Sequence, residues 1–174
     1  MKTLIATLLI CLLAQPAVFA QDSLAKPAKP QSEAKLALEK LKTFAGAWHG
    51  EIMRIPIDFS IRAASSGTAV VHEGNTEGGG PPNHEITMFY VDGERLLATH
   101  YCDAGNRSNM EGKMSPDGKT IKFSFLEVIG STRGGYMKEM ALTTVDADHH
   151  IVEVLFVMPD SKPIPLRGEF TKKK

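Results

Sequence analysis

Cysteine is scarce in this chain, and its scarcity limits how the fold can be stabilised. The 174 residues contain two cysteines: Cys11 and Cys102. Cys11 lies in an N-terminal segment that we expect to be cleaved. A single remaining thiol cannot form a disulfide within the chain, so stability must come from the packing of a hydrophobic core.

The chain also lacks an excess of charge of either sign. It has 20 Lys and Arg residues against 20 Asp and Glu residues. Nucleic-acid-binding domains ordinarily carry a basic surplus, so no nucleic-acid partner is predicted. The basic end Lys172–Lys174 is interpreted as a solvated terminus. The sequence shows no phosphate-binding loop, Gly-x-Ser-x-Gly elbow or pair of catalytic carboxylates, and it therefore indicates no enzyme class.

Long hydrophobic runs are missing as well. The apolar run at residues 3–13 (TLIATLLICLL) is too short to cross a bilayer comfortably. Lys2 precedes it, and the small residues of AVFA at 17–20 follow it, which is the pattern of a secretory signal peptide cleaved after Ala20. We therefore expect residues 1–20 to be removed. The mature protein is predicted to be exported, either periplasmic or secreted, with no integral membrane segment.

Helical periodicity is confined to a short segment near the N-terminus. Residues 21–31 (QDSLAKPAKPQ) carry two Lys-Pro pairs and no apolar period, which predicts a flexible linker. Ser32 is a candidate N-cap for a helix that ends near Gly46. Apolar residues recur there at three- and four-residue steps: Leu38, Leu41, Ala45 and Trp48. No long helical stretch follows, so residues 32–174 are predicted to form one domain without parallel βαβ units.

Beyond this helix the hydropathy alternates with period two, as in half-buried strands. Strands are predicted at 55–62, 68–75, 85–92, 95–102, 120–127, 136–145, 149–158 and 163–170. Residues 74–84 (GNTEGGGPPNH) predict a loop, because Gly and Pro favour loops. The dipeptide Asp92-Gly93 between two alternating runs predicts a tight hairpin.

An antiparallel meander of this kind leaves exposed edges unless it closes on itself. The predicted fold class is therefore all-β: an antiparallel up-and-down meander that closes into a lipocalin-like β-barrel of about 8–10 strands. A short N-terminal helix precedes the barrel.

Alternation also assigns side chains to the interior of the barrel. On the run 95–102 it places His100 and Cys102 on the inner face. Tyr90 and His150 are predicted to be further polar members of the interior. Each needs a partner, because an unpaired buried polar group costs roughly 1–3 kcal/mol. The candidate ligand-binding residues are Tyr90, His100, Cys102, Arg107, His150, Phe123, Phe125 and Phe156.

The pair formed by His100 and Cys102 raises two further interpretations. Their spacing lets both side chains touch one metal ion, but zinc needs three or four ligands and no second such pair exists, so no metal site is predicted. Cys102 as a nucleophile would need a lowered pKa and a neighbouring base, and we interpret it as a buried inert thiol. His100 and His150, both near strand ends, predict a polar rim around an apolar pocket. Arg107 is a candidate partner for a carboxylate or phosphate.

Two motifs resemble known families. LKTFAGAWHGE (41–51), a helix end running into Gly-x-Trp-x-Gly, resembles the opening of calycin-type barrels such as lipocalins, fatty-acid-binding proteins and nitrobindins. THYCDAGNRSNM (99–110) resembles an uncharacterised family of exported bacterial proteins of unknown function. The resemblance implies a lipocalin-like barrel but no established activity. We interpret Trp48 as the residue that closes the base of the barrel. Nitrobindins bind haem through a late histidine, so haem is a cofactor suggested by analogy, with His149 or His150 as its ligand.

The leading functional hypothesis is that an exported barrel binds a small, largely apolar molecule, with affinity supplied by buried apolar area. Three alternatives stay open. One is a haem- or metal-binding barrel that uses His100, His149 or His150. Another is an enzyme with His100 as acid or base, assisted by Tyr90 or Cys102, although catalysis is not the favoured interpretation. The last is an envelope interaction protein with a fully packed barrel. The sequence predicts neither the ligand nor the oligomeric state.

Overall fold

One α-helix and ten strands make up the computed structural model, which describes residues 31–76 and 83–174. The elements are α1 (Glu33–Lys42), β1 (Gly46–Ile52), β2 (Ile55–Ala64), a 3₁₀ turn (Ser65–Gly67), β3 (Ala69–Thr76), β4 (Asn83–Asp92), β5 (Arg95–Cys102), β6 (Asn106–Met114), β7 (Thr120–Gly130), β8 (Tyr136–Thr144), β9 (His149–Val157) and β10 (Ile164–Lys172). The predicted signal peptide (1–20) and residues 21–30 of the predicted linker lie outside the described residues.

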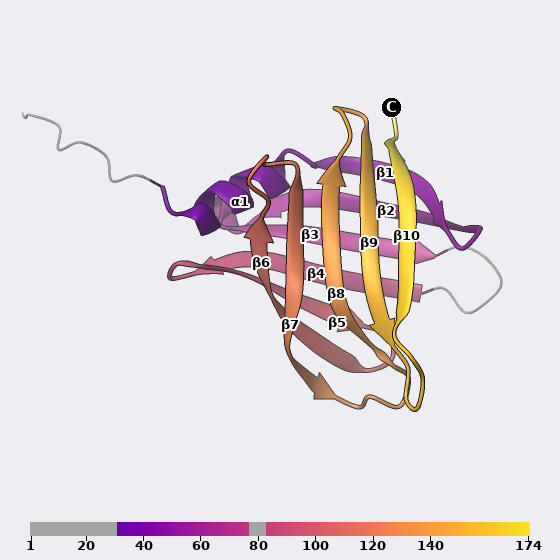
Figure 1. The fold of residues 1–174 in the computed structure, drawn as a ribbon. Coiled ribbons are helices and arrows are strands. Elements are labelled where there is room, and N and C mark those ends of the chain that lie inside the picture. Colours follow the sequence, from indigo (N-terminus) through magenta and orange to yellow (C-terminus); the bar gives the residue numbers. More distant parts are fainter. Residues whose placement is uncertain (1–30, 77–82) are drawn as a thin grey trace, which may run out of the picture. The chain divides into compact units, whose positions relative to one another are not determined.

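The strands form a closed antiparallel barrel (Figure 1). Each strand pairs with its neighbours in sequence, and β1 pairs with β10 to complete the ring. The predicted all-β meander and closed barrel are confirmed. The pairing between β7 and β8 covers only residues 120–124 of β7, so residues 125–130 of that strand are not paired with β8. Among the described residues, no helix has the length and apolar character needed to cross a membrane.

Helix α1 begins where the sequence predicts. The Ser32 side chain accepts a hydrogen bond from the Lys35 backbone N–H at 3.4 Å, as expected of an N-cap. The helix packs against β4, β5 and β6. Its buried residues lie at three- and four-residue steps: Ala34, Ala37, Leu38 and Leu41. Burial of this apolar stripe against one end of the barrel holds the short helix in place.

The helix is shorter than predicted, and it ends at Lys42. The N–H groups of Phe44 and Ala45 bond to carbonyls three residues back, and Gly46, with φ of 145°, redirects the chain into β1. Trp48 therefore lies on a strand rather than on the helix. Its indole N–H donates to the Phe44 carbonyl at 2.9 Å, and the side chain is 1% exposed, as expected of a residue that closes this end of the barrel.

Two strands are missing from the sequence prediction, β1 and β6. In β6 the inward positions alternate with more exposed ones, but most of the inward residues are small or polar rather than apolar: Asn106, Ser108, Met110 and Gly112.

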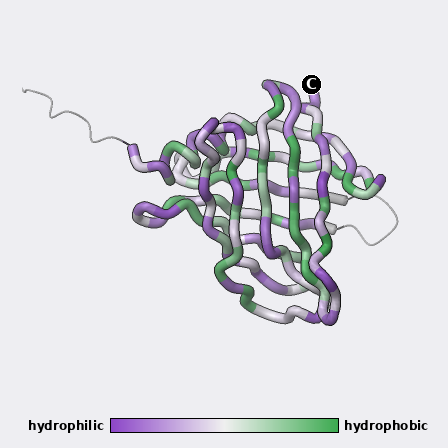
Figure 2. The backbone as a smooth tube through the Cα atoms, viewed as in Figure 1, coloured by the Kyte–Doolittle hydropathy of each residue, from purple (hydrophilic) through white to green (hydrophobic). Residues whose placement is uncertain are grey.

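The predicted loop at 74–84 is too long at both ends, because β3 continues to Thr76 and β4 begins at Asn83. Elsewhere hydrophobic and hydrophilic residues alternate along the strands (Figure 2).

Candidate functional site

A row of polar side chains crosses the inner wall of the barrel from β3 to β6. The strand register pairs His72 with Thr87, Thr87 with His100, and His100 with Ser108. Side chains paired in this way share a face of the sheet. Thr87, His100 and Ser108 are at most 2% exposed. Four adjacent strands therefore each contribute a polar group where a barrel core is ordinarily apolar.

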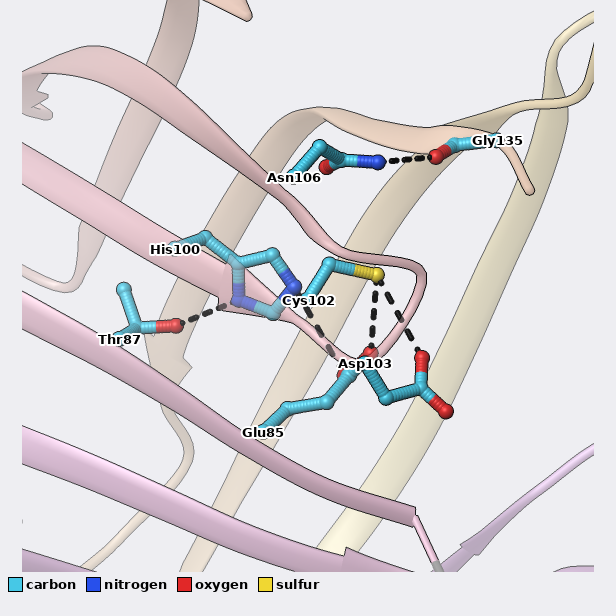
Figure 3. Close-up of polar contacts among 7 residues, drawn as sticks. All are labelled: Glu85, Thr87, His100, Cys102, Asp103, Asn106 and Gly135. Carbon is cyan, nitrogen blue, oxygen red and sulfur yellow. Dashed lines mark hydrogen bonds and ion pairs between the residues drawn. The ribbon is translucent and has the colours of Figure 1, made fainter. Parts of the chain in front are cut away.

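Glu85 and Cys102 lie beside this row, near the end of β5 (Figure 3). The Cys102 thiol donates to Glu85 Oε1 at 3.4 Å, and the other carboxylate oxygen lies 3.7 Å from His100 Nε2. The Glu85 side chain is 31% exposed, whereas that of His100 is 3% exposed. The carboxylate therefore stands between the buried imidazole and solvent.

The histidines of the row have unused hydrogen-bonding capacity. His100 Nδ1 and the Thr87 hydroxyl are 2.9 Å apart, which fixes the orientation of that ring. The Nε2 atoms of His72 and His100 are both buried, and neither has a hydrogen-bond partner among the described residues. Buried polar atoms normally have a hydrogen-bond partner. These two nitrogens therefore indicate a binding site for a ligand from outside the chain.

Burial sets the protonation states in this cluster. It lowers the pKa of His100 to about 4 and that of His72 to about 3, so both imidazoles are neutral at neutral pH. Burial also raises the pKa of the Glu85 carboxyl, and it raises that of the Cys102 thiol to about 12. A protonated thiol is a poor nucleophile, which agrees with the interpretation of Cys102 as unreactive in the metal-free protein.

A cavity of about 110 Å³ adjoins the polar row. One side of it carries the polar side chains: His72, Glu85, Thr87 and His100. The side formed by β8, β9 and β10 is apolar: Met137, Met140, Val152, Val154 and Phe170. The cavity therefore presents hydrogen-bonding groups on one wall and hydrocarbon on the other.

The predicted site residues on β5 are where the sequence placed them, whereas Tyr90 is not. His100 and Cys102 face inward and lie close together. The prediction that Tyr90 faces inward is wrong, because Thr87 and Phe89 occupy the inward positions of β4. The Tyr90 hydroxyl instead lies 3.5 Å from Thr99 on the outer face. Hydropathy misassigned β4 because its inward set contains Glu85 and its outward set contains Ile86 and Met88.

The residues after Cys102 have structural contacts. Gly105, with φ of 80°, allows the tight turn into β6. The Asn106 amide donates to the backbone carbonyls of Ser131 and Gly135 at 2.9 and 2.7 Å, which braces the loop between β7 and β8. Arg107 is exposed on the outer face, away from the cavity.

His150 does not line the cavity that His100 lines, so the predicted rim shared by the two histidines is wrong; Phe59 lies between His150 and His72 of the polar row. It packs edge-on against Trp48, with ring centroids 4.1 Å apart, and also contacts Phe44 and Phe170. Both of its ring nitrogens are buried without a partner among the described residues.

The predicted aromatic ligand contacts lie elsewhere in the core. Phe123 is fully buried, Phe125 packs against Tyr136 at 5.5 Å, and Phe156 is partly buried against the core. None of the three is among the residues that line the cavity. The hydrocarbon wall is built instead by residues outside the predicted ligand-binding set, including Val154.

The cavity beside the polar row does not fit a haem. A cavity of about 110 Å³ is well below the roughly 300–1,000 Å³ of pockets that hold drug-sized ligands. His150 is enclosed by aromatic rings. His149 is half exposed, and its Nδ1 bonds to Asp146 at 2.8 Å. Neither late histidine lines this cavity; both line a separate pocket of about 430 Å³ beside β9 and β10.

Comparisons with known proteins support the fold through solved structures and do not show a family or a function. No protein-family model matches this chain. No curated protein matches it either. Among solved structures it is similar to the crystal structure of Rv2717c from M. tuberculosis, with a TM-score of 0.60 and 14% sequence identity. The similarity covers 79% of this chain and 98% of that chain. At this identity it supports the barrel fold alone.

Proposed function

We propose that this protein is an exported, calycin-like barrel that binds one small, largely apolar molecule in its interior. The observation that carries the proposal is the two-sided cavity of about 110 Å³. An apolar wall supplies affinity through buried area. The unpartnered imidazole nitrogens of His72 and His100 supply a point of attachment for one polar group of the ligand.

The cavity size limits the ligand. Its volume of about 110 Å³ exceeds the roughly 10–15 Å³ that one water requires, and it is close to the roughly 150 Å³ of an engineered cavity that binds benzene. A fatty acid or another long lipid does not fit within it. The proposed ligand is therefore a molecule of about one aromatic ring with a single polar substituent.

Phenol and benzene are suitable probes, because they differ by one hydroxyl that can donate to or accept from an imidazole. We expect both to bind weakly to the metal-free protein, with phenol favoured. In His72→Leu the preference for phenol over benzene should fall by about 2–10-fold, since one net hydrogen bond contributes roughly 0.5–1.5 kcal/mol. Ligand-observed NMR titrations measure both dissociation constants.

The matched control is His149→Leu, which alters an exposed histidine outside the cavity and should leave both constants unchanged. Two results would contradict the proposal. One is the absence of saturable binding of either probe by the wild type. The other is an undiminished preference for phenol in a folded His72→Leu protein. Native mass spectrometry of protein purified from its own host then identifies the natural ligand.

Export is the second part of this proposal, and it rests on the charge and apolar pattern of residues 1–20. We expect protein recovered from the envelope or medium of its host to begin at Gln21. Edman sequencing or intact-mass measurement of that fraction checks this. An uncleaved chain beginning at Met1 and confined to the cytosol would rule export out.

A further inference from the structure

We propose that Glu85, His100 and Cys102 form a binding site for a zinc-type divalent metal ion at the edge of the cavity. The three residues come from two adjacent strands, β4 and β5. Their ligand atoms all lie within 4.8 Å of one another, and they supply one oxygen, one nitrogen and one sulfur. This inference goes beyond the proposed binding of an organic molecule and stands whether or not one binds.

Two of the distances within this group are close to those between neighbouring ligands of a tetrahedral site. Atoms bound at about 2.0–2.3 Å from zinc and separated by the tetrahedral angle lie roughly 3.3–3.8 Å apart. In the structure Cys102 Sγ lies 3.4 Å from Glu85 Oε1, and His100 Nε2 lies 3.7 Å from Glu85 Oε2. These distances run to the two oxygens of one carboxylate, and all the ligand atoms lie within 4.8 Å of one another. A small rearrangement of these side chains would therefore bring the three groups around one ion, which limits the ordering cost of binding.

His100 is the buried group that the metal would satisfy. Its residue is 2% exposed, and its Nε2 atom has no hydrogen-bond partner among the described residues. The opposite ring nitrogen is held by the Thr87 hydroxyl at 2.9 Å. Metal-binding histidines ordinarily use their second nitrogen in this way, because the hydrogen bond fixes the ring orientation and the tautomer. His100 is therefore oriented as a ligand before any ion arrives.

The charge of the three ligands and their access to solvent both favour a divalent metal ion. Binding displaces the thiol proton of Cys102 to solvent, and the resulting thiolate with the Glu85 carboxylate balances a divalent charge. A second carboxylate oxygen, of Asp103, lies 3.6 Å from the sulfur. The part-exposed Glu85 side chain offers a path for the ion. Since Glu85 and His100 both line the cavity, a fourth coordination position is available to water or to a bound molecule.

Cobalt(II) tests this site directly, because it reports thiolate coordination by absorbance. The protein is prepared in a Cys11→Ser background, reduced and freed of metal with a chelator. We expect one Co²⁺ per chain, a thiolate-to-metal charge-transfer band, and displacement of the cobalt by Zn²⁺. A wild-type spectrum typical of six-coordinate aqueous cobalt, without that band, would overturn the proposal.

Three variants separate metal ligation from folding. Cys102→Ser should lose the charge-transfer band. Thr87→Val should keep the band but weaken Zn²⁺ affinity by about 10–100-fold, the usual cost of losing an orienting partner. His149→Ala is the control and should change neither. Persistence of the band in Cys102→Ser would contradict the assignment.

A second measurement needs no variant of the site. Zn²⁺ should raise the midpoint of thermal unfolding of the metal-free protein, because the three ligands are assembled only in the folded chain. An unfolding midpoint that is the same with and without saturating Zn²⁺ would overturn the proposal even if the site variants failed to fold.

Discussion

Lowering the pH from about 7 to about 4.5 should cost the metal-free fold several kcal/mol of unfolding free energy. Three histidines are neutral inside the native barrel. Burial lowers the pKa of His72 to about 3 and the pKa values of His100 and His150 to about 4. In the unfolded chain each titrates near its ordinary value of about 6.5.

The direction of the effect follows from which state binds protons first. Because the folded pKa values are depressed, the unfolded chain takes up protons as the pH falls through about 6.5 while the native barrel does not. The stability associated with each histidine is fully present above that pH. It is lost progressively down to the pKa of that histidine in the fold. A pKa difference of about two units corresponds to nearly 3 kcal/mol per histidine.

His150 is the best position at which to test this, because it takes part in neither proposed site. It is 1% exposed and surrounded by aromatic rings. Neither of its ring nitrogens has a hydrogen-bond partner among the described residues. In His150→Phe we expect unfolding at neutral pH to cost at least as much as in the wild type, since no unpaired polar atom is then buried. At pH about 4.5 the variant should be the more stable by about 2 kcal/mol.

Urea unfolding followed across this pH range measures the difference. The exposed histidine variant His149→Phe should show the same pH dependence as the wild type. An identical pH dependence in His150→Phe and wild type would mean that His150 is not held neutral in the folded barrel.

Two glycine substitutions should have opposite consequences, although both glycines face the barrel interior. At Gly112 an added Cβ would lie 2.5 Å from a Phe123 ring carbon and 2.7 Å from a Leu96 methyl carbon. Both neighbours are at most 1% exposed and closely packed. Gly112→Val should therefore destabilise the barrel by about 3 kcal/mol or prevent folding.

Gly74 lines the cavity, and a Cβ there would meet nothing closer than Phe59 at 3.7 Å and His72 at 3.9 Å. Gly74→Val should leave stability unchanged or raise it by up to about 1 kcal/mol, because glycine is costly within a strand. It should also abolish phenol binding by filling the cavity.

Denaturant unfolding of both variants, followed by phenol titration of Gly74→Val, checks this pair. The cavity would be in doubt if Gly74→Val were as destabilising as Gly112→Val. Retained phenol binding in a folded Gly74→Val protein would place the ligand elsewhere.

The sequence predicted the barrel because most strands obey simple rules. Alternation located eight of the ten strands, and the hairpin predicted at Asp92-Gly93 is present: Asp92 pairs with Arg95, and Gly93 and Glu94 form the two-residue turn. It failed for β6, whose inward positions hold Asn106 and Ser108. There the position in the closed sheet, rather than hydropathy, decides which side chains are buried.

Hydropathy predicted the inward side chains of β5 but not those of β4. The register of the hairpin between these two strands predicts both. Counting back from the Asp92–Arg95 pair places Thr87 opposite His100. Paired residues share a face, so the inward assignment of His100 already required Thr87, and with it Glu85, to face inward. The apolar residues of β4, Ile86 and Met88, favour the opposite face and so hide this assignment from hydropathy alone. His72 carried no comparable pattern, because only the register of β3 against β4 brings it beside Thr87.

Long-range proton–nitrogen NMR spectra of the histidine side chains, recorded while phenol is added to metal-free protein, test most directly whether the polar row faces a ligand-binding cavity. We predict saturable shifts of the ring nitrogens of His72 and His100, with the signals of His49 and His149 unmoved. Unchanged His72 and His100 resonances at phenol saturation, or shifts confined to the exposed histidines, would contradict the account.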